Sequence, residues 1–292
     1  MFKRKTLFII GAGASKEAGL PCGDELALKI NGKLDIKIEG GSHIGNGDRS
    51  MFDAFLDSEG RRRESGTYVR TAWLIRDGIH LTDSIDNFLN LHRDNEYAIS
   101  LAKTTIVKCI LEAEKESMLW FDDSNLDKSI DFRSLHATWF AKFIKALGKD
   151  VRRDMATTLF DNVSFIVFNY DRCLEHFLHH AVRRLYGFGY EQAASICDEV
   201  EINHPFGMVA PLRIESGSGV LFGDVRAHSV NLAANIKTFT EQTLDGDMLG
   251  KIREQMLSAE CIIFLGLAFH DPVMLMLKSD AEMKPIQLFS TG

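Results

Sequence analysis

The segment LFIIGAGASKEAGLP, from Leu7 to Pro21, limits the possible folds more than any other part of the chain. Four apolar residues precede two glycines and a run of good helix formers, which predicts a buried strand, a tight turn and a helix. Gly11 and Gly13 allow the backbone to approach a ligand closely, and the free N–H groups at the start of the helix favour an anion. A strand-to-helix turn without a ligand is the alternative, and we favour phosphate binding.

The spacing of the glycines disfavours two familiar phosphate-binding motifs. A Walker A loop has the pattern G-x-x-x-x-G-K-[ST], whereas Lys16 follows Ser15 rather than a glycine. The dinucleotide fingerprint G-x-G-x-x-G would need a glycine at the position of Lys16, and the next glycine is Gly19. Triphosphate hydrolysis and ordinary hydride transfer are therefore both disfavoured.

Strand patterns return in the second half of the chain and alternate with helical patterns. The segments NVSFIVFNYD, ECIIFLGLAFHDP and PIQLFSTG have strong strand patterns, and EVEINHPFG and GVLFGD have weaker ones. Helices are predicted between them in RCLEHFLHHAVRRLYG and DMLGKIREQMLSAE. Such alternation is typical of a parallel sheet with helices packed on its faces.

Residues from about 25 to 155 have a different character. The polar stretch NGKLDIKIEGGSHIGNGDRS lacks periodicity and predicts an insertion or a surface loop, but helical spacing follows at residues 99–110 and 135–147. We therefore predict an α/β fold in one domain, residues 1–292. In it, a Rossmann-like parallel sheet is interrupted by a mostly helical insert.

Composition bears on compartment and partners. With 292 residues, 45% of them hydrophobic and 26% charged, the chain is long enough for one large α/β domain. The net charge of −7 argues against broad binding to nucleic acid, and we interpret Arg61 to Arg63 as a solvated loop rather than a basic site. Five cysteines without a C-x-x-C pair indicate reduced thiols in the cytoplasm, and no segment is long enough to span a membrane.

The glycine turn and three later segments carry a resemblance to a known family. GAGASKEAGLP resembles the opening motif of the sirtuin-like superfamily, in which G-A-G-[AI]-S leads into S-x-x-[AS]-G-[IL]-P over bound NAD. TDSIDNFL is similar to a segment of the bacterial sirtuin-like defence branch, and FNYD lies where sirtuins carry T-Q-N-[IY]-D. FLGLAFHDP resembles the late strand-and-glycine motif. The resemblance implies a sheet of the sirtuin type that binds NAD.

Two departures from the family narrow the function. Sirtuin deacylases carry a four-cysteine zinc module, and this chain has no such set of cysteines, so protein deacylation is disfavoured and no metal is expected. The family's catalytic histidine usually stands in H-G or H-x-H-G. Here the sequence is NHPFG, so His204 is separated from Gly207, and Phe206 takes the place of the second histidine.

The resemblance implies a role for each matching residue. Asn169 and His204 are the candidate catalytic residues: the amide would hold a ribose hydroxyl and a water, and the imidazole would act as general base. The residues expected to bind NAD are Gly11, Ala12, Gly13, Ser15, Asp171, Gly266 and Asp271. In a competing interpretation, Asn169 and Asp171 are N-caps of the helix that begins near Arg172, and Asp271 caps the next helix.

These features predict an NAD glycohydrolase, in which water replaces nicotinamide on the ribose. Resemblance to the bacterial branch implies antiphage defence by depletion of NAD. We expect a cytoplasmic enzyme that works with a separate sensor protein, as an oligomer, or both, without contacting membranes or nucleic acid directly. The alternative is a non-catalytic module that binds NAD, ADP-ribose or a related nucleotide and regulates a partner, which Phe206 supports. A zinc-independent deacylase or ADP-ribosyltransferase is a third and weaker hypothesis.

A group of histidines, His176, His179 and His180, lies outside these motifs. His176 and His180 have the i,i+4 spacing of metal ligands on a helix, but no H-E-x-x-H pattern or third ligand accompanies them. We predict surface or interface histidines.

Overall fold

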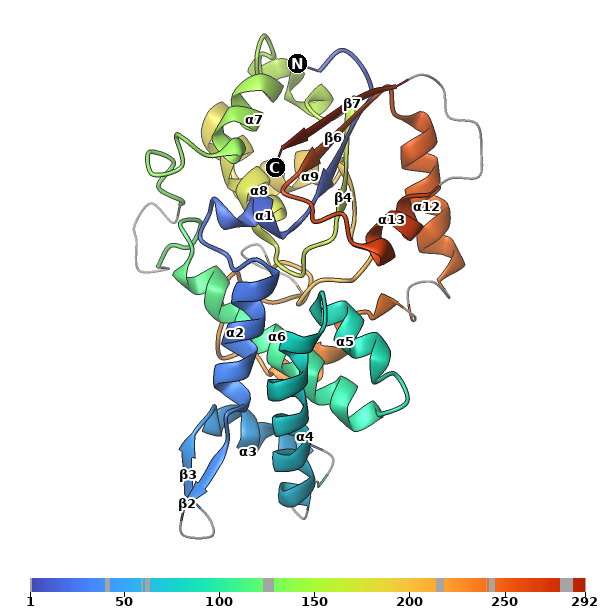
Figure 1. Cartoon of the computed structure of the whole chain (residues 1–292). Coiled ribbons are helices and arrows are strands. Elements are labelled where there is room, and N and C mark those ends of the chain that lie inside the picture. The colour runs from blue at the N-terminus through green and yellow to red at the C-terminus, as the bar shows by residue number, and fades with distance from the viewer. Residues whose placement is uncertain are drawn as a thin grey trace.

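Strand β1 (Thr6–Ile10) is completely buried and lies in the middle of a five-stranded sheet. The structure is a computed structural model that describes residues 2–39, 43–58, 60, 64–122, 129–213, 218–239, 241, 245–278 and 286–291. The run Arg61 to Arg63 lies outside these described residues. An unbroken apolar strand is expected where helices cover both faces of a sheet, and Figure 1 shows this arrangement.

The sheet has the strand order β5-β4-β1-β6-β7, and all its pairings are parallel. The other strands are β4 (Val163–Val167), β5 (Glu201–Asn203), β6 (Cys261–Leu265) and β7 (Gln287–Thr291). Phe8 of β1 is in register with Phe165 of β4 and with Ile263 of β6. The predicted Rossmann-like parallel sheet is thus confirmed.

Alternate residues of β1 face two different cores. Leu7 and Ile9 belong to a core that includes side chains of α12 (Gly246–Ser258) and α13 (Asp271–Leu277). Phe8 and Ile10 pack with side chains of α7 (Trp139–Leu147), α8 (Cys173–Tyr186) and α9 (Tyr190–Cys197). These two groups of helices cover opposite faces of the sheet (Figure 1).

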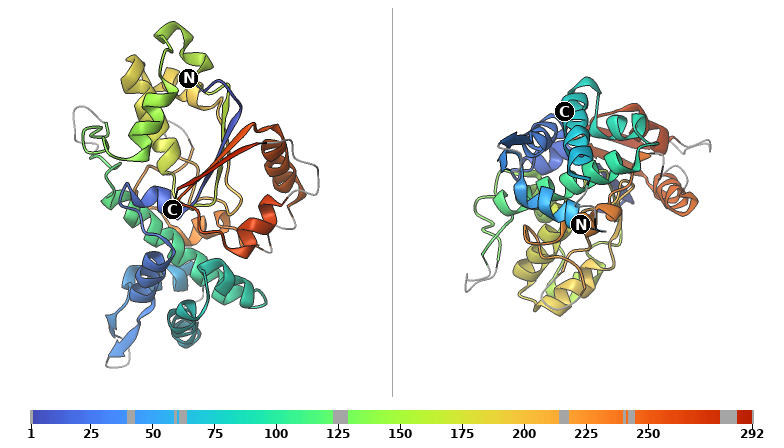
Figure 2. Two further views of the ribbon diagram at one scale, coloured as in Figure 1. Left: turned by 45° about the horizontal axis from the view of Figure 1, so that its top comes forward. Right: turned by 90° about the horizontal axis from the view of Figure 1, so that it is seen from below.

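The helices between β1 and α7 form a group beyond the edge at which β1 ends, and the left view of Figure 2 shows the same separation. After the short α1 (Ala12–Lys16) come α2 (Gly23–Leu34), α3 (Arg49–Asp57), α4 (Ser65–Gly78), α5 (Ile85–Leu91) and α6 (Glu96–Glu116). The long helix α6 begins where the Asn95 side chain accepts a hydrogen bond from the Ala98 N–H. It is buried on nearly all sides, from Leu101 to Glu114, so it is the central helix of the group rather than one with a single apolar face.

Several local predictions differ from the structure. The supposed loop after α2 contains a two-stranded antiparallel hairpin, β2 (Lys37–Glu39) and β3 (His43–Asn46). The predicted strand in GVLFGD is wrong, because its only pairing is an isolated bridge between Val220 and Leu212. Shorter helical segments complete the described chain: Ile79–Leu81, Arg153–Thr158, α10 (Ser229–Leu232) and Ala233–Asn235.

Two further properties concern the cysteines and the helices. All five cysteines are free thiols, as predicted. No helix in the described part of the chain combines the length and the apolar character that crossing a membrane requires.

Candidate functional site

The topology of the sheet identifies one point at its carboxyl edge where the strand order changes direction. From β1 the chain goes to β4 and β5 on one side, and then crosses to β6 and β7 on the other. In open parallel sheets, ligands bind where the strand order changes direction, beyond the carboxyl ends of the two strands concerned. Those strands are β1 and β6, and the turns that follow them begin with Gly11 and Gly266.

The three glycines predicted at this edge pack directly against one another. A Cβ atom at Gly11 would lie 2.6 Å from the Gly266 carbonyl oxygen, and one at Gly13 would lie 2.9 Å from the same atom. The Gly13 N–H donates a hydrogen bond of 3.0 Å to that oxygen. Gly266 has a φ of +55°, in the left-handed region that favours glycine. The glycines therefore let the two turns touch, which is a structural role in addition to the predicted one.

Three short polar side chains join the turn after β1 to the end of β4. The Asn169 amide nitrogen donates to the Gly11 carbonyl oxygen at 3.1 Å and to Ser15 Oγ at 3.0 Å. Ser15 Oγ in turn donates to Asp171 Oδ1 at 3.1 Å. All three side chains are buried. The structure thus brings together residues that are about 150 positions apart in the sequence.

The contacts of Asn169 and Asp171 define what each can still do. Both hydrogens of the Asn169 amide are used within the protein, while its oxygen has no hydrogen-bond partner among the described residues. This oxygen can accept a hydrogen bond from a hydroxyl or a water. Asp171 Oδ1 also accepts from the Cys173 N–H at 3.0 Å, so Asp171 helps to cap α8 as the competing interpretation proposed, whereas Asn169 does not. Burial raises the pKa of Asp171.

His204 lies next to Asn169, but both its ring nitrogens contact protein groups. Nε2 is 2.6 Å from Glu175 Oε1, and Nδ1 is 3.3 Å from the main-chain carbonyl oxygen of Asn169. Burial disfavours the charged imidazole, yet the Glu175 carboxylate outweighs it and raises the pKa of His204. Because both partners are acceptors, the arrangement suits an imidazolium that donates twice. In this geometry, His204 positions Asn169 and has no free nitrogen to act as base.

Glu175 is a site residue that the sequence analysis did not identify. It lies one turn into α8, four residues after Asp171, and this spacing is the only signal for it in the sequence. Burial opposes its ionisation, but the neighbouring His204 lowers the pKa of Glu175. Its second oxygen, Oε2, is buried without a hydrogen-bond partner among the described residues.

Phe206, which the sequence comparison with sirtuin-like motifs placed opposite a histidine, belongs to the hydrophobic core. It is 3% exposed, and its ring packs edge-on against Phe168 with a centroid distance of 5.6 Å. No ionisable group replaces the missing histidine at this position.

A second polar pair connects the helical group to the end of β4. The Tyr170 hydroxyl donates to Asp86 Oδ1 at 2.6 Å. Asp86 lies in the first turn of α5, which Ser84 caps by accepting from the Asn87 N–H. Burial raises the pKa of Asp86, and the nearby His270 opposes this effect. Three motifs singled out in the sequence thus converge here, although no role had been predicted for Asp86 or Tyr170.

The remaining predicted NAD-binding residues differ in their placement. Ala12 is half-buried and begins α1, in the turn that contains Gly11 and Gly13. Asp271 is exposed in the first turn of α13, and His270 rather than Asp271 occupies the N-cap position. The prediction that Asp271 caps this helix is therefore wrong. No hydrogen bond between the described residues joins Asp271 to Ser15, Asn169 or Asp171.

A buried ion pair lies immediately behind the site. Arg172, which is fully buried, donates from Nε to Glu114 Oε1 at 3.0 Å. Its two terminal nitrogens donate to the carbonyl oxygens of Val220 and Leu221. The pair therefore fastens α6, the start of α8 and the segment after residue 219 to one another.

Neither a search for metal sites nor the comparisons with known proteins give further information about the function. Within the described ranges, no group of three or more histidine, cysteine, aspartate or glutamate side chains could hold a metal ion. No family model matches the chain, and no curated protein matches it either. The function is therefore argued from the geometry of the site.

Proposed function

We propose that the chain binds NAD at the carboxyl edge of its sheet and hydrolyses the bond between nicotinamide and ribose. One observation carries this proposal: the network of Ser15, Asn169 and Asp171, which joins the glycine turn after β1 to the end of β4, next to the point between β1 and β6 where the strand order reverses. The motifs that resemble sirtuins contribute these same residues, so the chemistry and the resemblance support the same location. We further propose that the sheet is of the sirtuin type.

The proposed reaction needs little from the protein besides positioning. Water attacks C1′ of the nicotinamide ribose, the bond from C1′ to the ring nitrogen breaks, and its electron pair leaves with nicotinamide. The products are nicotinamide, ADP-ribose and a proton released to solvent. Because the sugar becomes cation-like before the water bonds, the water can lose its proton late, and orientation contributes most of the rate. The free oxygen of Asn169 is suited to hold this water or a ribose hydroxyl.

In this scheme His204 is a positioning residue. Its imidazolium donates one hydrogen bond to the main-chain carbonyl oxygen of Asn169 and another to the Glu175 carboxylate. This differs from the expectation of a general base, and the two roles predict opposite pH profiles. Activity that needs the imidazolium falls as the pH rises through the raised pKa of His204, whereas activity that needs a neutral base rises there.

The cellular role is proposed from the resemblance alone. Depletion of NAD in a phage-infected cell would stop phage propagation. The chain would then need a trigger, which a separate sensor protein, self-association or both would supply.

The second candidate function is a non-catalytic module that binds NAD, ADP-ribose or a related nucleotide and regulates a partner. Two observations favour it: both nitrogens of His204 contact protein groups, and Phe206 is part of the core. Such a module would use the same glycine turn and the same polar network to hold a ligand without cleaving it.

Release of nicotinamide from NAD by the purified chain tests the proposal, with and without the product of any neighbouring gene. We expect Asn169→Ala to lower the rate by about 10²-fold to 10³-fold, as removal of a positioned polar group at a reacting centre does. The matched control is Asn162→Ala, because Asn162 precedes the opposite end of β4 and bonds to the Phe2 carbonyl oxygen at 3.0 Å.

The outcomes separate the candidate functions. Loss of activity in Asn169→Ala but not in Asn162→Ala supports the hydrolase, and the pH profile of the wild type then decides the role of His204. Saturable NAD binding without nicotinamide release under any condition would favour the regulatory module. If the chain neither binds NAD nor releases nicotinamide, the proposed site is wrong.

A further inference from the structure

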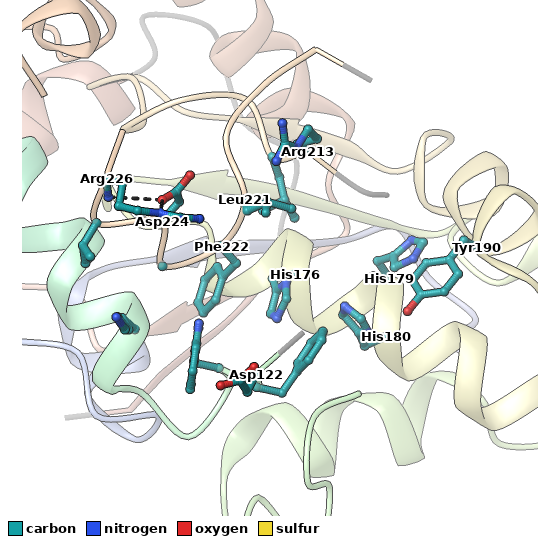
Figure 3. Close-up of a pocket in the computed structure, with 16 residues that line it drawn as sticks. Asp122, His176, His179, His180, Tyr190, Arg213, Leu221, Phe222, Asp224 and Arg226 are labelled. Atoms are coloured by element: carbon teal, nitrogen blue, oxygen red, sulfur yellow. Dashed lines mark hydrogen bonds and ion pairs between the residues drawn. The ribbon is translucent and has the colours of Figure 1, made fainter. Parts of the chain in front are cut away.

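A large cavity of the described chain lies away from the carboxyl-edge site. It has a volume of about 690 Å³, and the residues that line it do not include Ser15, Asn169, Asp171 or His204. One wall is α8, which contributes His176, His179 and His180, and the facing wall is the segment 221–226 (Figure 3). The predicted surface placement of these histidines is wrong, because all three are buried. We call this space the histidine cavity.

The histidines present polar atoms that the described residues leave without partners. His179 is 1% exposed, and neither of its ring nitrogens has a hydrogen-bond partner there; the same holds for Nδ1 of His180, which is 4% exposed. Burial lowers the pKa of His179 to about 4 and that of His180 to about 3, so both are neutral at pH 7 and can each donate and accept. A buried polar group without a partner destabilises the fold, and a ligand in the cavity would offset that cost.

Flat rings line the same space. His176 stacks on Phe222 with a centroid distance of 4.0 Å and an interplanar angle of 5°. Tyr190 lies nearly parallel to His179, and Phe121 meets His180 edge-on. Walls of this kind accept a planar heteroaromatic group.

Cations border the rings and exceed the acidic groups. Lys115, Arg213 and Arg226 line the cavity together with Asp122 and Asp224. Asp224 contacts Arg226 at 3.4 Å, and Lys115 Nζ lies over the Trp120 ring, 6.0 Å from its centroid. The Arg213 Nε is buried and has no hydrogen-bond partner among the described residues. A water-filled space would need neither the rings nor this guanidinium.

We propose that the histidine cavity is a second binding site, which takes a nucleoside monophosphate. The base lies against the rings, the histidines hydrogen-bond its edge, and the phosphate lies toward Arg213. The volume is within the range of about 300 to 1,000 Å³ for small-molecule sites. This inference is independent of whether the carboxyl-edge site hydrolyses NAD.

Calorimetric titration with AMP, adenosine and inorganic phosphate tests the second site. We expect AMP to bind, and to bind more tightly than adenosine or phosphate alone. Arg213→Gln removes the guanidinium from a half-buried side chain, and His180→Leu removes a ring edge; each is expected to weaken AMP binding at least about tenfold. Arg253→Gln is the matched control, because Arg253 is exposed on α12, across the sheet from α8.

Asn169→Ala distinguishes the two sites, and thermal melting of each variant checks that it is folded. AMP binding that is retained in Asn169→Ala and weakened in both Arg213→Gln and His180→Leu supports the proposal. Unchanged binding in a folded His180→Leu variant would overturn the contact between the histidines and the base. Three results would overturn it: no AMP binding, equal binding by wild type and Arg213→Gln, or loss in Asn169→Ala alone, which would place AMP at the carboxyl edge. Adenosine binding as tightly as AMP would overturn the role given to the phosphate.

Discussion

Glu175 is the side chain that determines the charge of His204. The two groups are 2.6 Å apart, with His204 buried and Glu175 half-buried, so each stabilises the ionised form of the other. Their coupling decides whether His204 donates two hydrogen bonds or acts as a base. It can be measured without a substrate, through the stability of the fold.

We expect Glu175→Gln to destabilise the chain most between about pH 4.5 and 6.5. The pKa of His204 is raised above its ordinary 6.5, so its contribution is fully present below 6.5 and is lost as the pH rises through the folded value. The pKa of Glu175 is lowered below its ordinary 4.5, so its contribution is present above 4.5 and is lost as the pH falls through the folded value. Melting temperatures of both proteins at about pH 5.5 and about pH 9 measure the difference. An equal difference at both pH values would mean that His204 is neutral in the fold.

At this scale the sequence predicted part of the site. Ser15, Asn169 and Asp171 stand in local motifs at the ends of strong strand patterns, so their meeting follows once the strands are known to be parallel neighbours. Glu175 was missed because it belongs to an ordinary amphipathic helix. The sequence analysis did not predict that both ring nitrogens of His204 contact protein groups, because this depends on the orientation of the ring, which no spacing in a sequence encodes.

At the scale of elements, the turns after β1 and β6 are in direct backbone contact. Gly266 combines a positive φ with a backbone neighbour where its side chain would be, since a Cβ atom there would lie 2.2 Å from the Ala14 nitrogen. Neither turn can move away without leaving the end of its strand.

Gly266→Ala is therefore expected to cost at least about 2 kcal/mol of unfolding free energy, from backbone strain and the clash together. Gly250→Ala is the matched control, because Gly250 lies inside α12 with nothing within 4 Å of an added Cβ atom. That change should stabilise the chain by about 0.4 to 1 kcal/mol. Urea unfolding of the two variants gives both values, and equal effects would show that the turns separate freely.

Periodicity predicted the regular elements well and the irregular ones poorly. The strands β1, β4, β6 and β7 and the helices α8 and α12 lie where apolar patterns placed them. Strand β1 is buried along its whole length, whereas the edge strand β7 is apolar in part but exposed. The segment GVLFGD has a strand-like composition, yet Arg172 bonds the carbonyl oxygens of Val220 and Leu221. The Arg172 side chain thus bonds the Leu221 carbonyl oxygen, which a strand would have paired, and shares the Val220 carbonyl oxygen with the Arg213 N–H.

At the scale of the whole molecule, the pair of Glu114 and Arg172 connects parts that the sequence keeps apart. Glu114 belongs to the central helix of the inserted group, and Arg172 begins the helix that covers one face of the sheet. Glu114 also accepts from the Gly223 N–H at 3.0 Å. Neither residue stands out in the sequence, because charged residues at helix ends are usually solvated.

We expect Glu114→Ala to destabilise the chain by about 3 to 5 kcal/mol, since it leaves Arg172 buried without its counter-ion. Glu116→Ala is the control: Glu116 is two residues away on the same helix, its side chain is 69% exposed, and it lies 3.5 Å from Lys29. A change within about 0.5 kcal/mol is expected there. Chemical denaturation measures both, and comparable small losses would show that water solvates Arg172 when its partner is gone.

Helix α8 extends from the carboxyl-edge site to the histidine cavity. Glu175 lies on its first turn, the cavity histidines follow on the next, and Arg172 just before it bonds the carbonyl oxygen of Leu221 in the cavity wall. A ligand that shifts this helix from one end changes the affinity at the other end, and thermodynamic reciprocity requires the same factor in both directions. Binding of a ligand at either site would then change the affinity of the other site for its own ligand.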